Sequence, residues 1–133
     1  MKFKFRVWDK EERAMLDVHG INFDAHGIWT NELIDDESDG NFIFLDDVEL
    51  MQSTGLIDKN GVEIYEGDIV ALKYPYDKRI KTKGIIVWDS YKPCFGISMI
   101  ETTERYELYR ITARNYLTVI GNVHQNSELL EDE

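Results

Sequence analysis

The chain has 133 residues, of which 43% are hydrophobic and 12% aromatic, and its formal net charge at pH 7 is −11. A single domain with a sizeable core is expected at this length, and the hydrophobic content excludes a wholly disordered chain. Strong acidity disfavours generic nucleic-acid binding, because it repels a phosphate backbone. No apolar run reaches the roughly 20 residues of a membrane-spanning helix, and the charged amino end differs from a signal peptide, so a cytoplasmic protein is predicted.

Short strands separated by polar turns are predicted in the first half of the chain. Phe3, Phe5 and Val7 alternate with basic residues, which is the period-two pattern of a half-buried strand. Residues 48–52 are expected to form either a strand or one helical turn with Asp46 as its N-cap. A turn that ends at Gly27 is expected between the third and fourth strands. The expected strands lie at residues 3–7, 15–18, 21–23, 28–33 and 42–45.

Two turns organise the middle of the chain. Asp58-Lys59-Asn60-Gly61 lies between two apolar stretches, and this pattern predicts a hairpin in which Gly61 takes a positive φ. Glu66-Gly67-Asp68 then precedes an apolar run that is typical of a strand entering a core.

The second half of the chain is expected to form one sheet. The most apolar stretch, 84–88, is the predicted central strand, and Gly96 in its neighbour marks a bulge or a close backbone approach. Residues 103–115 are expected to form either a strand followed by a turn or a short helix, and 127–133 either fray or form a helical turn. The expected strands lie at residues 68–74, 84–88, 94–100, 106–111 and 117–123.

These elements predict a mainly β fold with at most short helical turns. Residues 56–124 share one apolar set and are expected to form a small, partly open barrel of the SH3-like kind. Residues 1–55 would add a β-meander packed on this barrel, and 125–133 would form an acidic tail, within a single domain over 1–133.

Three segments carry a family resemblance. They are the opening MKFKFRVWD, the central LMQSTGLIDKNGVEIYEGDIV and the ending VIGNVHQNSELL, in this order across nearly the whole chain. They resemble the corresponding segments of the YopX family, small proteins of bacteriophages and prophages. The departures are Ser53, where the family often has Tyr, and Ser127, where it often has Pro. The resemblance implies a phage-encoded, mostly β protein inside a bacterial host, with no established activity, cofactor or catalytic residues to carry over.

One acidic segment has the spacing of a calcium-binding EF-hand loop. Its ligand-type residues depart from the usual pattern, with Glu as the third and the shorter Asp as the twelfth, so a solvated acidic turn is the favoured interpretation. The positions of the motif are Asp35, Glu37, Asp39, Gly40, Phe42 and Asp46.

The histidines and the single cysteine could form a metal site only by converging through the fold. The histidines are His19, His26 and His124. Surface or turn histidines, and a buried, inert thiol at Cys94, are expected instead.

Glu66 and Asp68 could form a hydrolytic acid–base pair in one pocket. The favoured interpretation is turn chemistry, in which Asp68 accepts hydrogen bonds from nearby backbone N–H groups. Neither a nucleophile elbow nor a glycine-rich phosphate loop occurs in the sequence, so we predict no catalytic residues, no cofactor and no metal, and we do not expect an enzyme.

The segment 73–83 is the best candidate for a partner site. It holds five basic residues and one acidic residue, whereas 31–50 holds eight acidic residues and no Lys or Arg. Aromatic side chains beside basic ones suit stacking on single-stranded nucleic acid or on a protein surface, although solvated loops and core packing are the simpler interpretation. The candidate partner-binding residues are Tyr74, Tyr76, Lys78, Arg79, Lys81 and Lys83.

We therefore expect an accessory protein that self-associates or binds a host or phage protein. A homo-oligomer would pair the acidic segment of one copy with the basic segment of another. Nucleic-acid binding through Lys73–Lys83 is the alternative, and a hydrolase using Glu66 or Asp68 is the weakest hypothesis. No membrane association is expected.

Overall fold

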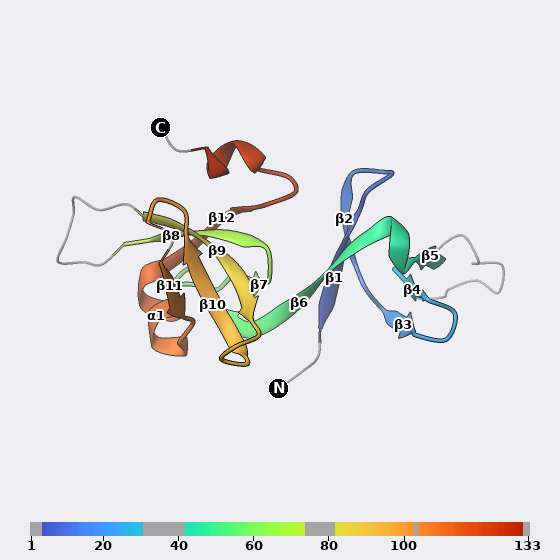
Figure 1. The fold of residues 1–133 in the computed structure, drawn as a ribbon, viewed down its shortest axis with the longest axis horizontal. Helices are drawn as coiled ribbons and strands as arrows, with labels where there is room; N and C mark the ends of the chain where they lie inside the picture. The colour runs from blue at the N-terminus through green and yellow to red at the C-terminus, as the bar shows by residue number, and fades with distance from the viewer. Residues whose placement is uncertain (1–3, 31–41, 74–81, 103, 132–133) are drawn as a thin grey trace. The chain divides into compact units, whose positions relative to one another are not determined.

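The computed structural model describes residues 4–30, 42–73, 82–102 and 104–131, and antiparallel strands dominate it (Figure 1). The predicted mainly β class is confirmed, with one short α-helix and a five-stranded sheet that curls into a half-barrel. The chain divides into two compact units, Lys2–Gln52 and Ser53–Glu133.

The first unit is built around strand β1. β1 pairs with β2 on one side and with the first half of β6 on the other, while β3, β4 and β5 form a separate three-stranded sheet. Residues 48–52 form a strand, not a helical turn. They are the first half of β6, which begins directly after a short 3-10 helix. The elements are β1 (Phe5–Asp9), β2 (Ala14–Asp17), β3 (Gly20–Asn22), β4 (Gly27–Trp29), β5 (Phe42–Phe44), the 3-10 helix η2 (Leu45–Asp47) and β6 (Val48–Ile57).

The predicted turn between the third and fourth strands is confirmed, and Gly27 lies directly after it. The positive φ of this turn, 56°, belongs to His26, and Gly27 is the buried first residue of β4. A Cβ atom at Gly27 would lie 2.1 Å from the ring of Phe42, whose ring centroid is 5.3 Å from that of Trp29. Glycine at this position therefore leaves room for aromatic packing, and this packing leaves no signal in the turn sequence.

The second unit contains the curled sheet, in the order β11-β10-β9-β8-β12. The predicted central strand is confirmed as β9, which lies between β8 and β10. The elements of the second unit are β7 (Glu63–Tyr65), β8 (Asp68–Leu72), β9 (Thr82–Asp89), β10 (Cys94–Met99), β11 (Arg105–Glu107), α1 (Arg110–Tyr116), β12 (Leu117–Asn122) and the 3-10 helix η3 (Ser127–Leu130).

Helix α1 replaces the second half of the strand predicted at 106–111. β11 ends at Glu107, and α1 places Ala113, which is fully buried, in the core cluster of the curled sheet. Thr112 and Tyr116 are half-buried beside it, which is a helical spacing rather than an alternating one. Of the two structures predicted for 103–115, the short helix is therefore confirmed for the second part of this segment.

The core of the second unit gathers apolar side chains from residues 64–117, as the shared apolar set predicted. Its fully or nearly fully buried members are Ile64, Val70, Leu72, Ile86, Ile97, Met99, Ala113 and Leu117. Cys94, in contrast, is only half-buried, because it is the first residue of β10. The expectation of a buried thiol was wrong in this respect.

Candidate functional site

A hollow of about 610 Å³ opens on the second unit where β10, β11 and α1 meet. Its apolar floor consists of Leu72, Ile97 and Met99, which also belong to the core. Hollows of this size are typical of sites that enclose a small molecule or a large side chain. The polar rim comes mainly from β11 and its neighbours: Lys92, Glu104, Arg105, Tyr106, Glu107 and Tyr109.

Two tyrosine–glutamate pairs order the rim of this hollow. The Tyr106 hydroxyl donates a hydrogen bond to the Glu104 carboxylate, and the Tyr109 hydroxyl donates one to the Glu107 carboxylate. Lys92 Nζ lies 3.7 Å from Glu107 Oε1. Glu107 therefore forms an ion pair with Lys92 and also accepts the hydrogen bond from Tyr109. Tyr106 and Tyr109 remain 50% and 59% exposed, so their rings are available to a ligand at the mouth of the hollow.

Glu107 perturbs the titration of Tyr109. The hydrogen bond to the Glu107 carboxylate, and then the negative charge of that group, raise the pKa of Tyr109 above its usual 10.0. Because the raised pKa favours the neutral phenol, the contact is intact below pH 10.0 and is lost as the pH rises through the raised pKa.

We therefore expect Glu107→Gln to lower the pKa of Tyr109 towards 10.0. The measurement is a pH titration of the tyrosine ring carbons by NMR. Glu101→Gln, which changes an exposed carboxylate outside the rim, is the matched control and should leave the pKa of Tyr109 unchanged. An equal pKa in the wild-type and Glu107→Gln proteins would contradict the contact.

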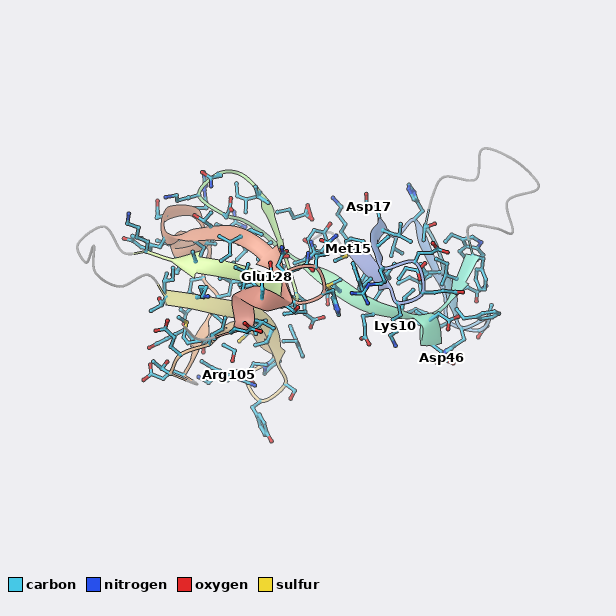
Figure 2. The ribbon with its side chains drawn as sticks, turned by 90° about the horizontal axis from the view of Figure 1, so that it is seen from above. Lys10, Met15, Asp17, Asp46, Arg105 and Glu128 are labelled. Atoms are coloured by element: carbon cyan, nitrogen blue, oxygen red, sulfur yellow. The ribbon has the colours of Figure 1, made fainter. Side chains whose placement is uncertain are left out.

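The outer edge of β11 borders the hollow. Leu108 N donates to Phe95 O at 3.0 Å, and Met99 N donates to Glu104 O at 2.8 Å. Between these two hydrogen-bonded pairs, Tyr106 lies opposite Ile97. Alternate residues of an antiparallel strand bond to the neighbouring strand, so the main-chain groups of Arg105 and Glu107 point away from β10. β11 is the end strand of its sheet among the described residues, and the Arg105 side chain lies at the outside of the second unit (Figure 2).

Most of the partner-site residues predicted from the sequence lie outside the described ranges. These are Tyr74, Tyr76, Lys78, Arg79 and Lys81. Lys83 is described, and its Nζ donates a hydrogen bond to Leu129 O at 2.9 Å. Lys83 therefore has a structural partner on the 3-10 helix η3.

The calcium-like motif is also described only at its end. Positions 35–41 lie outside the described ranges, and Asp46 Oδ1 lies 3.2 Å from His26 Nε2. Lys10, which lies beside Asp46 in Figure 2, donates from Nζ to Asp46 O at 3.4 Å. Across the described residues, no three His, Cys, Asp or Glu side chains gather closely enough to hold a metal ion.

Asp68 acts as a turn residue, as the favoured interpretation predicted. Its carboxylate is 1% exposed, and Oδ2 accepts a hydrogen bond from Tyr65 N at 2.7 Å. Gly67 between Glu66 and Asp68 has a φ of +88°, a conformation that glycine adopts without strain. Neither acid lines the hollow beside β11.

The rim of the hollow is not among the site residues predicted from the sequence. The run Glu104-Arg105-Tyr106-Glu107-Leu108-Tyr109 carries the signal, because each tyrosine lies two residues after a glutamate. The same spacing also fits an ordinary solvated edge strand, so only the shared hollow distinguishes a site from a surface.

The described residues define a mainly β protein whose five-stranded sheet curls into a half-barrel. Among these residues, no helix is long and apolar enough to cross a membrane. The chain belongs to the YopX family, because the family model described as YopX protein matches residues 4–131. A search of curated proteins found no match.

Two solved structures share this fold. Protein EF1440 from Enterococcus faecalis is 30% identical, with a TM-score of 0.73 over 98% of this chain and 99% of the other. Protein yopX from Bacillus subtilis is 21% identical, with a TM-score of 0.66 over 100% of this chain and 99% of the other. Neither description states an activity, so function has to be argued from the site.

Proposed function

We propose that this protein is a partner-binding module that takes an extended protein segment along β11. A large apolar side chain of that segment enters the hollow of about 610 Å³. The observation that carries the proposal is the position of an apolar hollow beside main-chain groups that point away from β10.

The edge of β11 supplies the main-chain part of this recognition. An extended segment can add a strand to an open sheet edge, where backbone hydrogen bonds give affinity and pockets for alternate side chains give specificity. Arg105 and Glu107 present outward N–H and C=O groups, and both residues also line the hollow. One bound segment can therefore use both features.

The rim supplies orientation. Exposed tyrosines are enriched at protein interfaces, because their rings give contact area and their hydroxyls give hydrogen bonds. The rim carries two cations, Lys92 and Arg105, and two anions, Glu104 and Glu107. This balanced charge suits a peptide with polar groups on either side of an apolar anchor, rather than a polyanion.

We also propose a setting for this protein, which its membership of the YopX family supports. We place the protein in the cytoplasm of a bacterial host as a phage or prophage accessory protein, with a host or phage protein as partner. A second copy of this chain, as in a homo-oligomer, is the main alternative occupant of the hollow.

The test is a random-peptide display library selected on the full-length protein, with the affinities of selected peptides measured by fluorescence anisotropy. Thr112→Trp fills the hollow from α1, and Ile111→Trp places the same side chain on the preceding, exposed residue outside it. We expect peptides with a large apolar residue to lose at least about tenfold in affinity with Thr112→Trp, or about 1.4 kcal/mol, and little with Ile111→Trp.

Two outcomes would overturn this proposal. Failure to select any such peptide, or equal binding to both variants, would exclude the hollow as a peptide site. Light scattering on the same samples at low and high salt tests the alternative occupant. A stable dimer that Thr112→Trp dissociates would assign the hollow to a second copy.

A further inference from the structure

A second hollow, of about 490 Å³, lies between the Asp58–Gly61 turn and helix α1. Three cationic side chains line it, Lys59, Arg110 and Arg114. We propose that this hollow binds the phosphoryl group of a small phosphorylated molecule, independently of the peptide site beside β11.

The cations of this hollow lack acidic partners. Within the described ranges, none of Lys59, Arg110 and Arg114 forms an ion pair. Among the described residues that line the hollow, Asp58 alone is acidic, and it is 2% exposed. Its carboxylate accepts three backbone N–H groups, from Asn60, Val62 and Val119, and so is directed into the fold.

This arrangement is unexpected in a chain with a net charge of −11. Abundant carboxylates normally neutralise exposed cations, so three unneutralised cations around one hollow create a local positive potential. An oxyanion that carries two or more charges is the ligand that best compensates it. Carboxylates carry one charge each, which favours a phosphoryl group.

The fold places the three cationic residues around the hollow through their backbone positions. Arg110 and Arg114 are four residues apart on α1 and therefore lie on one face of the helix. Lys59 belongs to the facing turn, where its N–H donates to Leu117 O at 3.0 Å. Guanidinium groups bind phosphoryl oxygens through pairs of parallel hydrogen bonds, so two arginines and a lysine can surround one group.

The apolar part of the lining indicates the rest of the ligand. Ile57 and Ile111 are 41% and 73% exposed beside the cations. They suit a phosphate ester with an apolar or planar part. The overall negative charge disfavours a long polyanion, because most of a polymer would lie outside this hollow and be repelled.

The test is an NMR titration of the full-length protein with pyrophosphate at low salt. Amide signals of residues 57–61 and 110–115 should shift and saturate. Arg110→Gln/Arg114→Gln should weaken binding by at least about tenfold, whereas Arg105→Gln, a matched change on β11, should alter it by less than about twofold. Thr112→Trp should leave it unchanged, which separates this site from the peptide site.

Other probes distinguish the ligand class. The proposal is overturned if the wild-type protein shows no saturable shift or if the double variant, with an unchanged urea unfolding midpoint, binds equally well. A glutamate-rich peptide that binds as tightly as pyrophosphate would show a general anion surface. A single-stranded oligonucleotide that binds much more tightly, and loses binding in the double variant, would replace the small molecule with nucleic acid.

Discussion

Asp58→Ala is expected to destabilise the protein by about 3–5 kcal/mol, because it removes a buried acceptor that three backbone N–H groups share. Oδ1 accepts from Asn60 N at 2.8 Å and from Val62 N at 2.9 Å, which closes the turn between β6 and β7. Oδ2 accepts from Val119 N at 2.9 Å, which ties this turn to β12. Alanine would leave these donors without their acceptor at a site that is 2% exposed.

Equilibrium urea unfolding of the full chain measures this loss as a lower midpoint. Asp89→Ala is the matched control, because Asp89 also accepts from two turn N–H groups, of Tyr91 and Lys92, but is only half-buried. We expect it to cost about 1 kcal/mol or less, since water can replace the exposed bonds. Equal losses for the two variants would contradict a special role for Asp58.

Asp58→Asn distinguishes the hydrogen bonds within the turn from the hydrogen bond that connects the turn to β12. An asparagine Oδ1 can still accept from Asn60 and Val62, but its Nδ2 would face the Val119 N–H, donor against donor. We therefore expect a loss between those of the wild-type and alanine proteins. Hydrogen exchange of the Val119 amide should accelerate more than that of Asn60.

Gly84→Ala is expected to destabilise the protein by about 1–3 kcal/mol through overpacking of the core. Gly84 lies in the central strand β9, opposite Met99 of β10, and is buried. A Cβ at this position would lie 2.4 Å from Ile97 Cγ2 and 3.3 Å from Met99 Sδ. Ile97 is 1% exposed and branched at Cβ, so it has little freedom to move aside.

A double-mutant cycle with Ile97→Ala tests this cause. Ile97→Ala alone should cost about 2–5 kcal/mol, because it leaves a cavity in the core. If the new methyl group clashes with Ile97, the double variant should cost less than the sum of the two single losses by about 1 kcal/mol or more. Additive losses in urea unfolding would show that the cost of Gly84→Ala has another source.

Asp58 and Gly84 show how far local sequence predicts this fold. The hairpin around Asp58 is predictable because Asp, Asn and Gly at these spacings favour one turn, and Gly61 has the expected positive φ of 82°. The bond from Val119 is not predictable, because its donor lies 61 residues away. Likewise, the apolar run 84–88 predicts a central strand, but not that Gly84 makes room for Ile97.

The packing role of Gly27 cannot be predicted locally for the same physical reason. A glycine at the end of a polar stretch fits a turn, and the sequence alone carries no sign of the Phe42 ring that fills the space above it. Residues 103–115 fit either a strand or a helix for a related reason. Their sequence alternates imperfectly, and the burial of Ala113 in the core of the curled sheet decides for the helix α1 in the second part.

The mainly β class, the positions of most strands and turns, and the resemblance to the YopX family can all be read from the sequence. These properties depend on side-chain alternation and turn chemistry over a few neighbouring residues, or on motifs that can be read directly. The positions of the hollows, and the charged groups that line them, depend instead on how distant segments pack together. Leu72, Met99 and Tyr109 meet through sheet pairing and the packing of α1, as do Lys59 and Arg114, and such contacts between distant segments leave no local pattern.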